Sequence, residues 1–394
     1  MASGAAAATA VKCGQVVTSS IRLANNLVNC PGNGLVIGAN NITVDLGGHS
    51  ITGTNAKGGE GVADDGHAGV HIQNGTIARF FSHGVGLRKA PHSTVSNLTI
   101  RAIGAGGADP DTSAGVLVQD SSFTSVLKST VSNDVKAFQS DGVDVLTSPS
   151  STIQGNTLAR NNWDGMVVLF SPDTQVIANA FQGNKNQGLE LNGSSDRSVV
   201  RGNFAANNAS NGLTVGASSG VRIENNFLQG NPESGLFMFD LHGARISNNQ
   251  AGFNGAGIDL EGGQFGSTNN VLSNNATNRN TFVGLIVENA ANNNVLTANT
   301  ADSNQGPPGQ GGGIIVASAN GNTLRSNVAV GNLDVGIGVF AGDPGDTKRN
   351  VLTGNFATGN HAHGIDALAG TIDGGGNVAH DNTPLPNCLG VVCS

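Results

Sequence analysis

The sequence is poor in aromatic and charged residues: it has no tyrosine, a single tryptophan and only 12% Asp, Glu, Lys and Arg. An average soluble domain has about twice that share of charged residues, so this is not ordinary globular usage. No stretch of 18 consecutive apolar residues occurs, which disfavours a transmembrane helix. The net charge of -8 and the absence of Lys/Arg clusters disfavour a nucleic-acid partner.

Cysteine is also scarce, and its four copies form two local pairs, Cys13 with Cys30 and Cys388 with Cys393. None has the C-x-x-C spacing of a zinc or redox site. Each pair can close a short loop, which predicts two disulfides and an oxidising compartment; four free buried thiols are the alternative. The start MASGAAAATAVKCG reads like a small-residue cleavage zone, so we expect a secreted protein whose residues 1–12 are disordered or processed.

Glycine is abundant, with 59 copies, and it marks an internal repeat. Glycine followed by three residues that are mostly strand formers recurs at intervals of 22 to 29 residues. The marker occurs as GVLV at 115, GVDV at 142, GMVV at 165, GLEL at 188, GLTV at 212, GLFM at 235, GIDL at 257, GLIV at 284, GIIV at 313, GIGV at 336 and GIDA at 364.

Asparagine repeats in phase with glycine, as ten pairs separated by five residues, from Asn156 and Asn161 to Asn377 and Asn382. Short strands divided by Asn and Gly turns, without a long helical period, indicate coils stacked as a parallel β-helix. Asn tolerates the left-handed conformation at bends, and its amide can bond the amide one coil away, which predicts buried Asn ladders. The second and fourth marker positions should face the core and the third should face out.

These repeats resemble the right-handed parallel β-helix proteins of the pectin-lyase-like superfamily, in particular the Asn-rich bacterial members. The resemblance runs from ITVDLGGHSITG at 42–53 to about residue 382. It implies an all-β fold, a single-stranded right-handed parallel β-helix solenoid of about 12–14 coils. We expect the solenoid to span residues 13–382 and a disulfide-stapled tail to span 383–394.

Acidic residues gather at outward positions of three successive coils: Asp141, Asp144, Asp164 and Glu190. Equivalent positions on neighbouring coils lie about 4.8 Å apart, so these carboxylates should repel one another and some of their pKa values should rise. Such a cluster can supply both an acid and a base. The alternative is a solvated surface, because Asp before Gly is a common turn former.

Further residues on the same series of coils are candidates for substrate binding, with aromatic side chains stacking on sugars or, alternatively, packing under loops. They are Trp163, Lys185, Phe237, Phe239, Asp259 and Glu261.

The segment SDGVD at 140–144 resembles the N-T-D-G-[IV]-D element of polygalacturonase-type inverting glycoside hydrolases. That resemblance implies a catalytic Asp141, and NWDG on the next coil supplies Asp164. The second Asp of the family's pair and its G-H-G and R-[IV]-K elements have no counterpart. Inverting glycosidases hold their carboxyl groups about 6.5–9.5 Å apart, a spacing that stacked coils can provide.

We therefore predict a hydrolase acting on a polysaccharide or oligosaccharide, with Asp164 as general acid and Asp141 or Glu190 as base. A non-catalytic solenoid that binds glycans or cell surfaces is one alternative. A polyuronate lyase or epimerase is another, with Lys185, or Arg88 with Lys89, as the base. We expect no cofactor or metal, with calcium at Asp109 and Asp111 left open.

Overall fold

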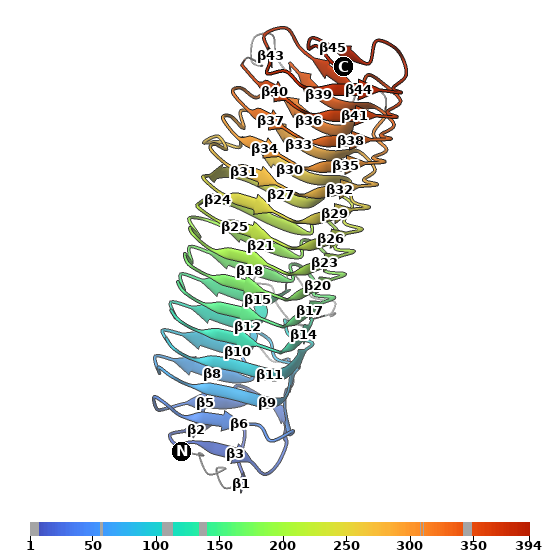
Figure 1. Cartoon of the computed structure of the whole chain (residues 1–394). Helices are drawn as coiled ribbons and strands as arrows, with labels where there is room; N and C mark the ends of the chain where they lie inside the picture. Colours follow the sequence, from blue (N-terminus) through green and yellow to red (C-terminus); the bar gives the residue numbers. More distant parts are fainter. Residues whose placement is uncertain are drawn as a thin grey trace, which may run out of the picture. The chain divides into compact units, whose positions relative to one another are not determined.

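The computed structural model describes residues 8–55, 58–104, 113–133, 140–307, 309, 311–341 and 349–394. The chain divides into two compact units, unit 1 (residues 1–195) and unit 2 (residues 196–394). Within each unit the chain winds through successive coils of parallel strands, and the described residues contain no helix (Figure 1). The all-β parallel solenoid is confirmed.

Each coil contributes one strand to a sheet that carries the Gly marker, here called the glycine sheet. In unit 1 its strands are β2 (Gln15–Val17), β5 (Leu35–Ile37), β8 (Val62–Asp65), β10 (His83–Arg88), β12 (Ser113–Gln119), β15 (Ser140–Leu146), β18 (Met166–Leu169) and β21 (Leu189–Asn192). In unit 2 they are β24 (Leu213–Ser219), β27 (Ser234–His242), β30 (Ala256–Glu261), β33 (Val283–Glu288), β36 (Gly312–Ala317), β39 (Val335–Phe340), β42 (Ile365–Ala367) and β45 (Cys388–Leu389).

The rest of each coil runs through the corner sheet, where most strands have three residues. In unit 1 these are β1 (Ala8–Thr9), β3 (Ile21–Leu23), β4 (Leu27–Cys30), β6 (Thr43–Asp45), β7 (Ser50–Gly53), β9 (His71–Ala78), β11 (Thr94–Arg101), β13 (Ser125–Leu127), β14 (Thr130–Ser132), β16 (Thr152–Gln154), β17 (Thr157–Ala159), β19 (Gln175–Ile177) and β20 (Ala180–Gln182). In unit 2 these are β22 (Val199–Arg201), β23 (Phe204–Ala206), β25 (Arg222–Glu224), β26 (Phe227–Gln229), β28 (Arg245–Ser247), β29 (Gln250–Gly252), β31 (Val271–Ser273), β32 (Ala276–Asn278), β34 (Val295–Thr297), β35 (Thr300–Asp302), β37 (Thr323–Arg325), β38 (Val328–Val330), β40 (Val351–Thr353), β41 (Phe356–Thr358), β43 (Ile372–Asp373) and β44 (Val378–His380).

The predicted Asn ladders are present in both units. In unit 1 the Nδ2 atom of Asn161 donates to Oδ1 of Asn184 at 2.9 Å. In unit 2 one ladder runs from Asn203 to Asn377 and a second from Asn208 to Asn382, each linking successive coils. Bonding buried amides to one another removes the cost of leaving them unpaired, so the ladders stabilise the corners.

The ladders also explain why the glycine marker keeps phase with asparagine. A Cβ added to Gly257 would lie 2.7 Å from Nδ2 of Asn280 and 2.4 Å from the carbonyl oxygen of Gly284 on the next coil. Any side chain there would displace either the ladder or the neighbouring backbone. Glycine is therefore required by close approach at this position.

The core confirms the alternation predicted for the marker strands, since Val143 and Val145 are fully buried. The third position faces away from this core but is also buried at several coils, including Leu117 in unit 1 and Ile286 and Ile315 in unit 2. In unit 2, Ile286 and Ile315 pack with neighbouring apolar residues in a second cluster. The outer face of the glycine sheet is thus not a uniformly solvated surface.

The solenoid contains more coils than the 12–14 predicted, because each unit has eight described strands in its glycine sheet. The early coils carry the same marker, as Gly34-Leu35, Gly61-Val62 and Gly84-Val85, but with less regular residues after it. The first strand of the structure lies within residues 1–12, the segment expected to be disordered or processed. Ala8 and Thr9 form β1, which pairs in parallel with β3.

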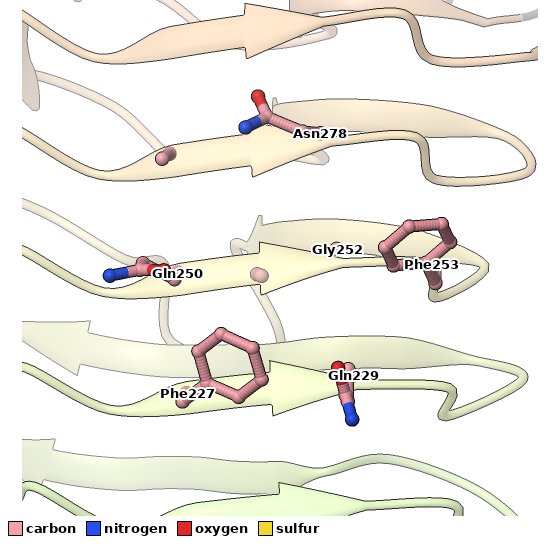
Figure 2. Close-up of a pocket in the computed structure, with 8 residues that line it drawn as sticks. Phe227, Gln229, Gln250, Gly252, Phe253 and Asn278 are labelled. Carbon is pink, nitrogen blue, oxygen red and sulfur yellow. The ribbon is translucent and has the colours of Figure 1, made fainter.

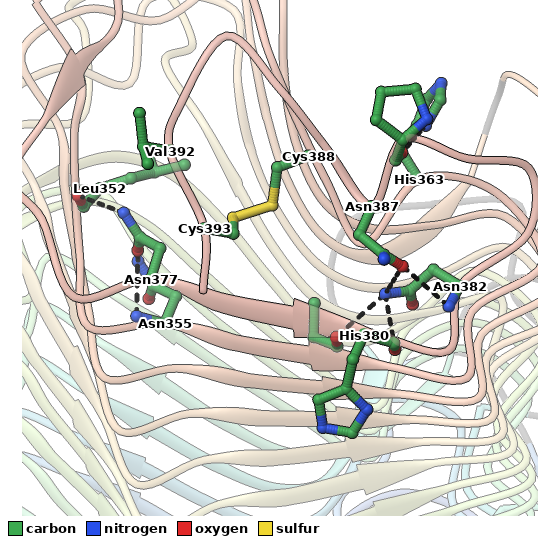
Figure 3. The surroundings of a disulfide bond; sticks show 12 residues. Leu352, Asn355, His363, Asn377, His380, Asn382, Asn387, Cys388, Val392 and Cys393 are labelled. Carbon is green, nitrogen blue, oxygen red and sulfur yellow. Dashed lines mark hydrogen bonds between the residues drawn. A yellow bond between two sulfur atoms is a disulfide. The ribbon is translucent and has the colours of Figure 1, made fainter.

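Both predicted disulfides are present, joining Cys13 to Cys30 and Cys388 to Cys393. Next to the second disulfide (Figure 3), β45 pairs with β42, and the backbone of Cys393 forms an isolated parallel β-bridge with that of Asn377. The last ladder amide, that of Asn382, donates to Oδ1 of Asn387 at 3.2 Å. The segment after β44 therefore closes over the final coil.

Candidate active site

Asp141 and Asp164 occupy the position just before the marker glycine on successive coils of unit 1. Oδ1 of Asp141 accepts a hydrogen bond from the backbone N–H of Asp164 at 2.8 Å. Oδ1 of Asp164 likewise accepts from the backbone N–H of Gln187 at 2.7 Å. Each carboxyl group thus uses one oxygen to tie its coil to the next.

Asp144 lies on β15 at the third marker position, with its side chain 7% exposed. Its carboxyl group shares a hydrogen bond with that of Asp141, and its Oδ1 has no partner among the described residues. Burial and then the charge of Asp164 raise the pKa of Asp144 to about 8. Burial and then the charge of Asp144 raise the pKa of Asp141 well above its usual range.

Burial, followed by repulsion from Asp141, also raises the pKa of Asp164 to about 8. Three neighbouring carboxyl groups therefore resist ionisation, as expected for like charges held in a site with little water. The proton shared by Asp141 and Asp144 belongs to the pair, because coupled groups titrate together. This matches the prediction that stacked acids raise one another's pKa values.

Glu190 completes the cluster, two rungs from Asp144 through Val167. Its side chain is only partly exposed and lies 3.4 Å from the side-chain amides of both Gln187 and Asn192. These amides orient the carboxylate. Two rungs correspond to about 10 Å between backbones, near the upper end of the range used by inverting glycosidases.

The substrate-binding candidates of unit 1 lie around this cluster. Trp163 is 36% exposed and is fixed by backbone hydrogen bonds to Ser140 and Asn186 on adjacent coils. The Nζ atom of Lys185 donates to Oδ1 of Asn162 at 2.6 Å on the exposed turn. Trp163 keeps a free ring surface, whereas the lysine is engaged on the turn.

A second group of polar residues on the same sheet was not predicted as a site. Glu60 accepts hydrogen bonds from Arg88 (2.6 and 3.2 Å), and its Oε1 lies 2.8 Å from Nδ1 of His83. Hydrogen bonds from His83 and Arg88 outweigh the opposing effect of burial and lower the pKa of Glu60 to about 2. His83 is 3% exposed, and its Nε2 has no partner within the described structure.

His83 lies in the same column as Asp141, with Ala114 between them. Arg88 was considered only as a base, but here its guanidinium neutralises Glu60. The signal for this group was the glycine marker of the early coils, because it places Glu60 and His83 at the position that Asp141 and Asp164 occupy later.

The other candidate residues belong to unit 2 and form a cluster of their own. Phe237 and Phe239 have ring centroids 5.7 Å apart, and on the next coil they pair with Asp259 and Glu261. Burial raises the pKa of Asp259 to about 8, and the charges of Glu288 and Glu261 add to this effect. Glu288, the last residue of β33, pairs with Glu261 and was missed because that strand has no other acid.

No group of three His, Cys, Asp or Glu residues suited to a metal ion occurs in the described part of the chain. The calcium alternative at Asp109 and Asp111 lies outside the described residues. Within the same limits, no helix is long and apolar enough to cross a membrane.

Several solved structures are similar to this chain. The periplasmic alginate epimerase AlgG is 15% identical over 86% of this chain and 75% of its own, with a TM-score of 0.51. The A-module of mannuronan C-5 epimerase AlgE6 from Azotobacter vinelandii is 14% identical, over 92% and 90% of the two chains, with a TM-score of 0.46. The catalytic unit of a GH87 α-1,3-glucanase from Streptomyces thermodiastaticus strain HF3-3 is 14% identical, over 94% and 62%, with a TM-score of 0.43. At these identities the similarity concerns the fold.

Among curated protein sequences, no match is found. The family model described as "Right handed beta helix region" matches residues 83–251 and 215–383, overlapping stretches that together cover most of the chain. With parallel coils in both units and this match, the chain belongs to the right-handed β-helix family.

Proposed function

We propose that unit 1 acts on a polysaccharide as a glycoside hydrolase. The observation that carries this proposal is the group of four carboxyl residues on three successive coils, of which three have raised pKa values. A carboxyl group that stays protonated near neutral pH can donate a proton to a glycosidic oxygen. Hydrolysis needs such an acid together with a carboxylate that activates water.

Exposure changes which residue we assign as the acid. Asp164 is 1% exposed, so a substrate does not reach it in this structure, and its Oδ1 is held by Gln187. Asp141 is partly exposed and also has a raised pKa. We assign Asp141 as general acid and Glu190 as base, with burial and the neighbouring carboxyl group of Asp144 keeping the proton on the acid.

In this assignment Asp141 gives its proton to the oxygen of the leaving sugar as the glycosidic bond breaks. Glu190 takes a proton from a water molecule, whose oxygen attacks the anomeric carbon from the opposite face. Asp141 and Glu190 lie on coils two rungs apart and at different positions along their strands, and a wide separation that admits a water molecule is the arrangement that inverts the anomeric configuration. Trp163 supplies a ring surface on which a sugar can stack.

A location outside the cytoplasm is part of the proposal. The two disulfides support it, because such bonds persist in oxidising compartments. The solved structure with a TM-score of 0.51 is named as a periplasmic alginate epimerase, which agrees with a polysaccharide as the substrate class.

The test is incubation of the protein with a panel of neutral and uronate polysaccharides, reading both new reducing ends and ultraviolet-absorbing unsaturated ends. We expect reducing ends alone. Asp141→Asn and Glu190→Gln should each lower the rate at least 100-fold, whereas Glu233→Gln, an exposed acid of unit 2, should not change it. No product from any glycan would contradict the hydrolase and favour the non-catalytic binder.

A uronate lyase or epimerase is the second candidate, favoured by His83 and Arg88 on the same sheet. A histidine can abstract the proton beside a carboxylate and an arginine can neutralise that carboxylate. Because His83 is 3% exposed and Arg88 is paired with Glu60, this reaction requires the substrate to open the group and displace Glu60 from Arg88. Unsaturated ends, or an altered ratio of uronate epimers without cleavage, would identify this activity. It should then be lost in His83→Gln and retained in Glu190→Gln.

A further inference from the structure

Unit 2 has a surface depression on the outer face of its corner sheet, whereas the charged clusters described above lie on the glycine sheet. Its volume is about 140 Å³, and three consecutive strands, β26, β29 and β32, form it. The eight lining residues are Phe227, Gln229, Gln250, Ala251, Gly252, Phe253, Ala276 and Asn278. None of them is charged.

The floor of the depression is bare because its residues are small. A Cβ added to Gly252 would lie 2.8 Å from the carbonyl oxygen of Asn278, so no side chain fits there. Ala276 provides only a methyl group. The first and third of these strands, β26 and β32, are about 10 Å apart, so the depression extends over about that length of the sheet.

Two exposed aromatic rings flank this floor on neighbouring coils, as Figure 2 shows. Phe227 is 41% exposed and stacks on Phe204, with 5.7 Å between ring centroids and 10° between planes. Phe253 is 58% exposed and lies at a turn with φ of 60°, where the adjacent coil has Gly230. Because more than half of its surface is exposed, Phe253 gains little stability from burial.

The polar groups around the rings are neutral amides. Within the described structure, the side chains of Gln229 and Gln250 make no hydrogen bond to protein. Asn278 uses its Oδ1 to accept from the backbone of Asp302 at 3.2 Å, which fixes its orientation and leaves its NH₂ directed elsewhere. These groups offer both donors and acceptors without charge.

We propose that this depression binds a neutral sugar chain, independently of the carboxylate cluster in unit 1. Phenyl rings stack on the C–H faces of sugars, and amides pair with adjacent hydroxyl groups. A neutral chain is favoured over a uronate chain, because the lining residues are uncharged and the adjacent cation, Arg279, is engaged on the Phe253 ring. Arg279, whose guanidinium lies 5.7 Å from the centroid of the Phe253 ring, already contacts that ring.

The test is electrophoresis of the full chain through gels containing dextran, galactomannan or hydroxyethyl cellulose, with alginate gels for comparison. Neutral polysaccharides should slow the protein, and any retardation by alginate should be the same in Phe227→Ala and Phe253→Ala as in wild type, because it would come from unit 1. Phe227→Ala or Phe253→Ala should weaken binding about tenfold. Phe123→Ala is the matched control, because Phe123 in unit 1 is 56% exposed with φ of 57°.

Gln250→Leu separates a sugar site from an apolar protein contact, since it keeps the bulk and removes the amide. Sugar binding should weaken about three- to tenfold, whereas an apolar contact would not weaken. No retardation by any neutral polysaccharide, equal effects of Phe123→Ala and Phe253→Ala, or self-association abolished by Phe227→Ala would each overturn the proposal. Asp141→Asn should lose hydrolysis but keep retardation, so this proposal and that for unit 1 fail separately.

Discussion

At the residue scale, the carboxyl cluster of unit 1 combines a structural and a chemical role in the same side chains. Asp141 and Asp164 each hold the next coil through one oxygen, as neutral Asn211 does for Ser234 in unit 2. Asparagine would satisfy that bond without burying an acid. The use of Asp at these positions therefore costs stability, which is the pattern expected where a shifted pKa serves a function.

The cost should be visible in the pH dependence of stability. The pKa of Asp144 is about 8 in the folded protein and about 4 in an unfolded chain, so between these values the unfolded state loses its proton first. Folding stability from this group is then lost as pH rises from about 4 to 8. Asp144→Asn should remove this loss and raise the free energy of unfolding at pH 8 by about 1–3 kcal/mol, less than the full linkage value because neighbouring acids share the proton.

Urea unfolding of wild type and Asp144→Asn at pH 4 and pH 8 measures the difference. The two proteins should be close at pH 4 and diverge toward pH 8. Profiles that stay parallel would show that Asp144 ionises normally in the folded state.

At the element scale, the Asn ladders act as continuous structures along each unit. Asn280 accepts two hydrogen bonds from Asn254, at 3.0 and 3.3 Å, and donates to Asn304 and to the carbonyl of Ala251. The side chain of Asn280 is fully buried, and so are these four hydrogen bonds. Loss of one member therefore leaves buried groups on neighbouring coils without partners.

Asn280→Ala should lower the free energy of unfolding by about 2–4 kcal/mol, because it removes four buried hydrogen bonds and leaves a cavity. Asn269→Gly, at an exposed turn with φ of 58°, is the control and should stay within about 0.5 kcal/mol of wild type. Chemical unfolding measures both. An equally small effect of the two substitutions would mean that water replaces the ladder.

The ladders also show how much the sequence could predict. Gly142 and Asn161 belong to markers that recur once per coil, every 22 to 29 residues, so the fold, the strand direction and the ladders were predictable. Glu60 and His83 lie one coil apart just before the marker glycine, so the repeat could have placed them together, whereas the contact of Arg88 with Glu60, 28 positions away, joins positions that are not equivalent in the repeat. The burial of Asp164 was equally hidden, because an Asp-Gly pair in a turn looks solvated in a sequence.

At the scale of the whole molecule, the two disulfides lie in different units and close loops of different length. Cys13 and Cys30 are 17 residues apart, and Cys388 and Cys393 are five apart. A longer loop loses more unfolded-state entropy when closed. The first disulfide should therefore stabilise its unit more than the second.

Replacing Cys13 and Cys30 together by Ala should cost about 3 kcal/mol, and replacing Cys388 and Cys393 about 2 kcal/mol. Thermal unfolding of each double variant, with proteolysis to locate the segment that opens first, checks the order. A larger loss from the second pair would show that its contacts with the last coil, and not loop entropy, dominate.

The segment that closes over the last coil has a consequence for behaviour at high concentration. A bare final strand would offer unpaired amides and carbonyls, the template on which β-sheets of separate molecules join into fibres. Here β45 and the bridge from Cys393 to Asn377 occupy part of that template, and Asn387 takes up the final ladder amide. We therefore expect the segment closed by the Cys388–Cys393 disulfide to hinder end-to-end pairing of strands between molecules.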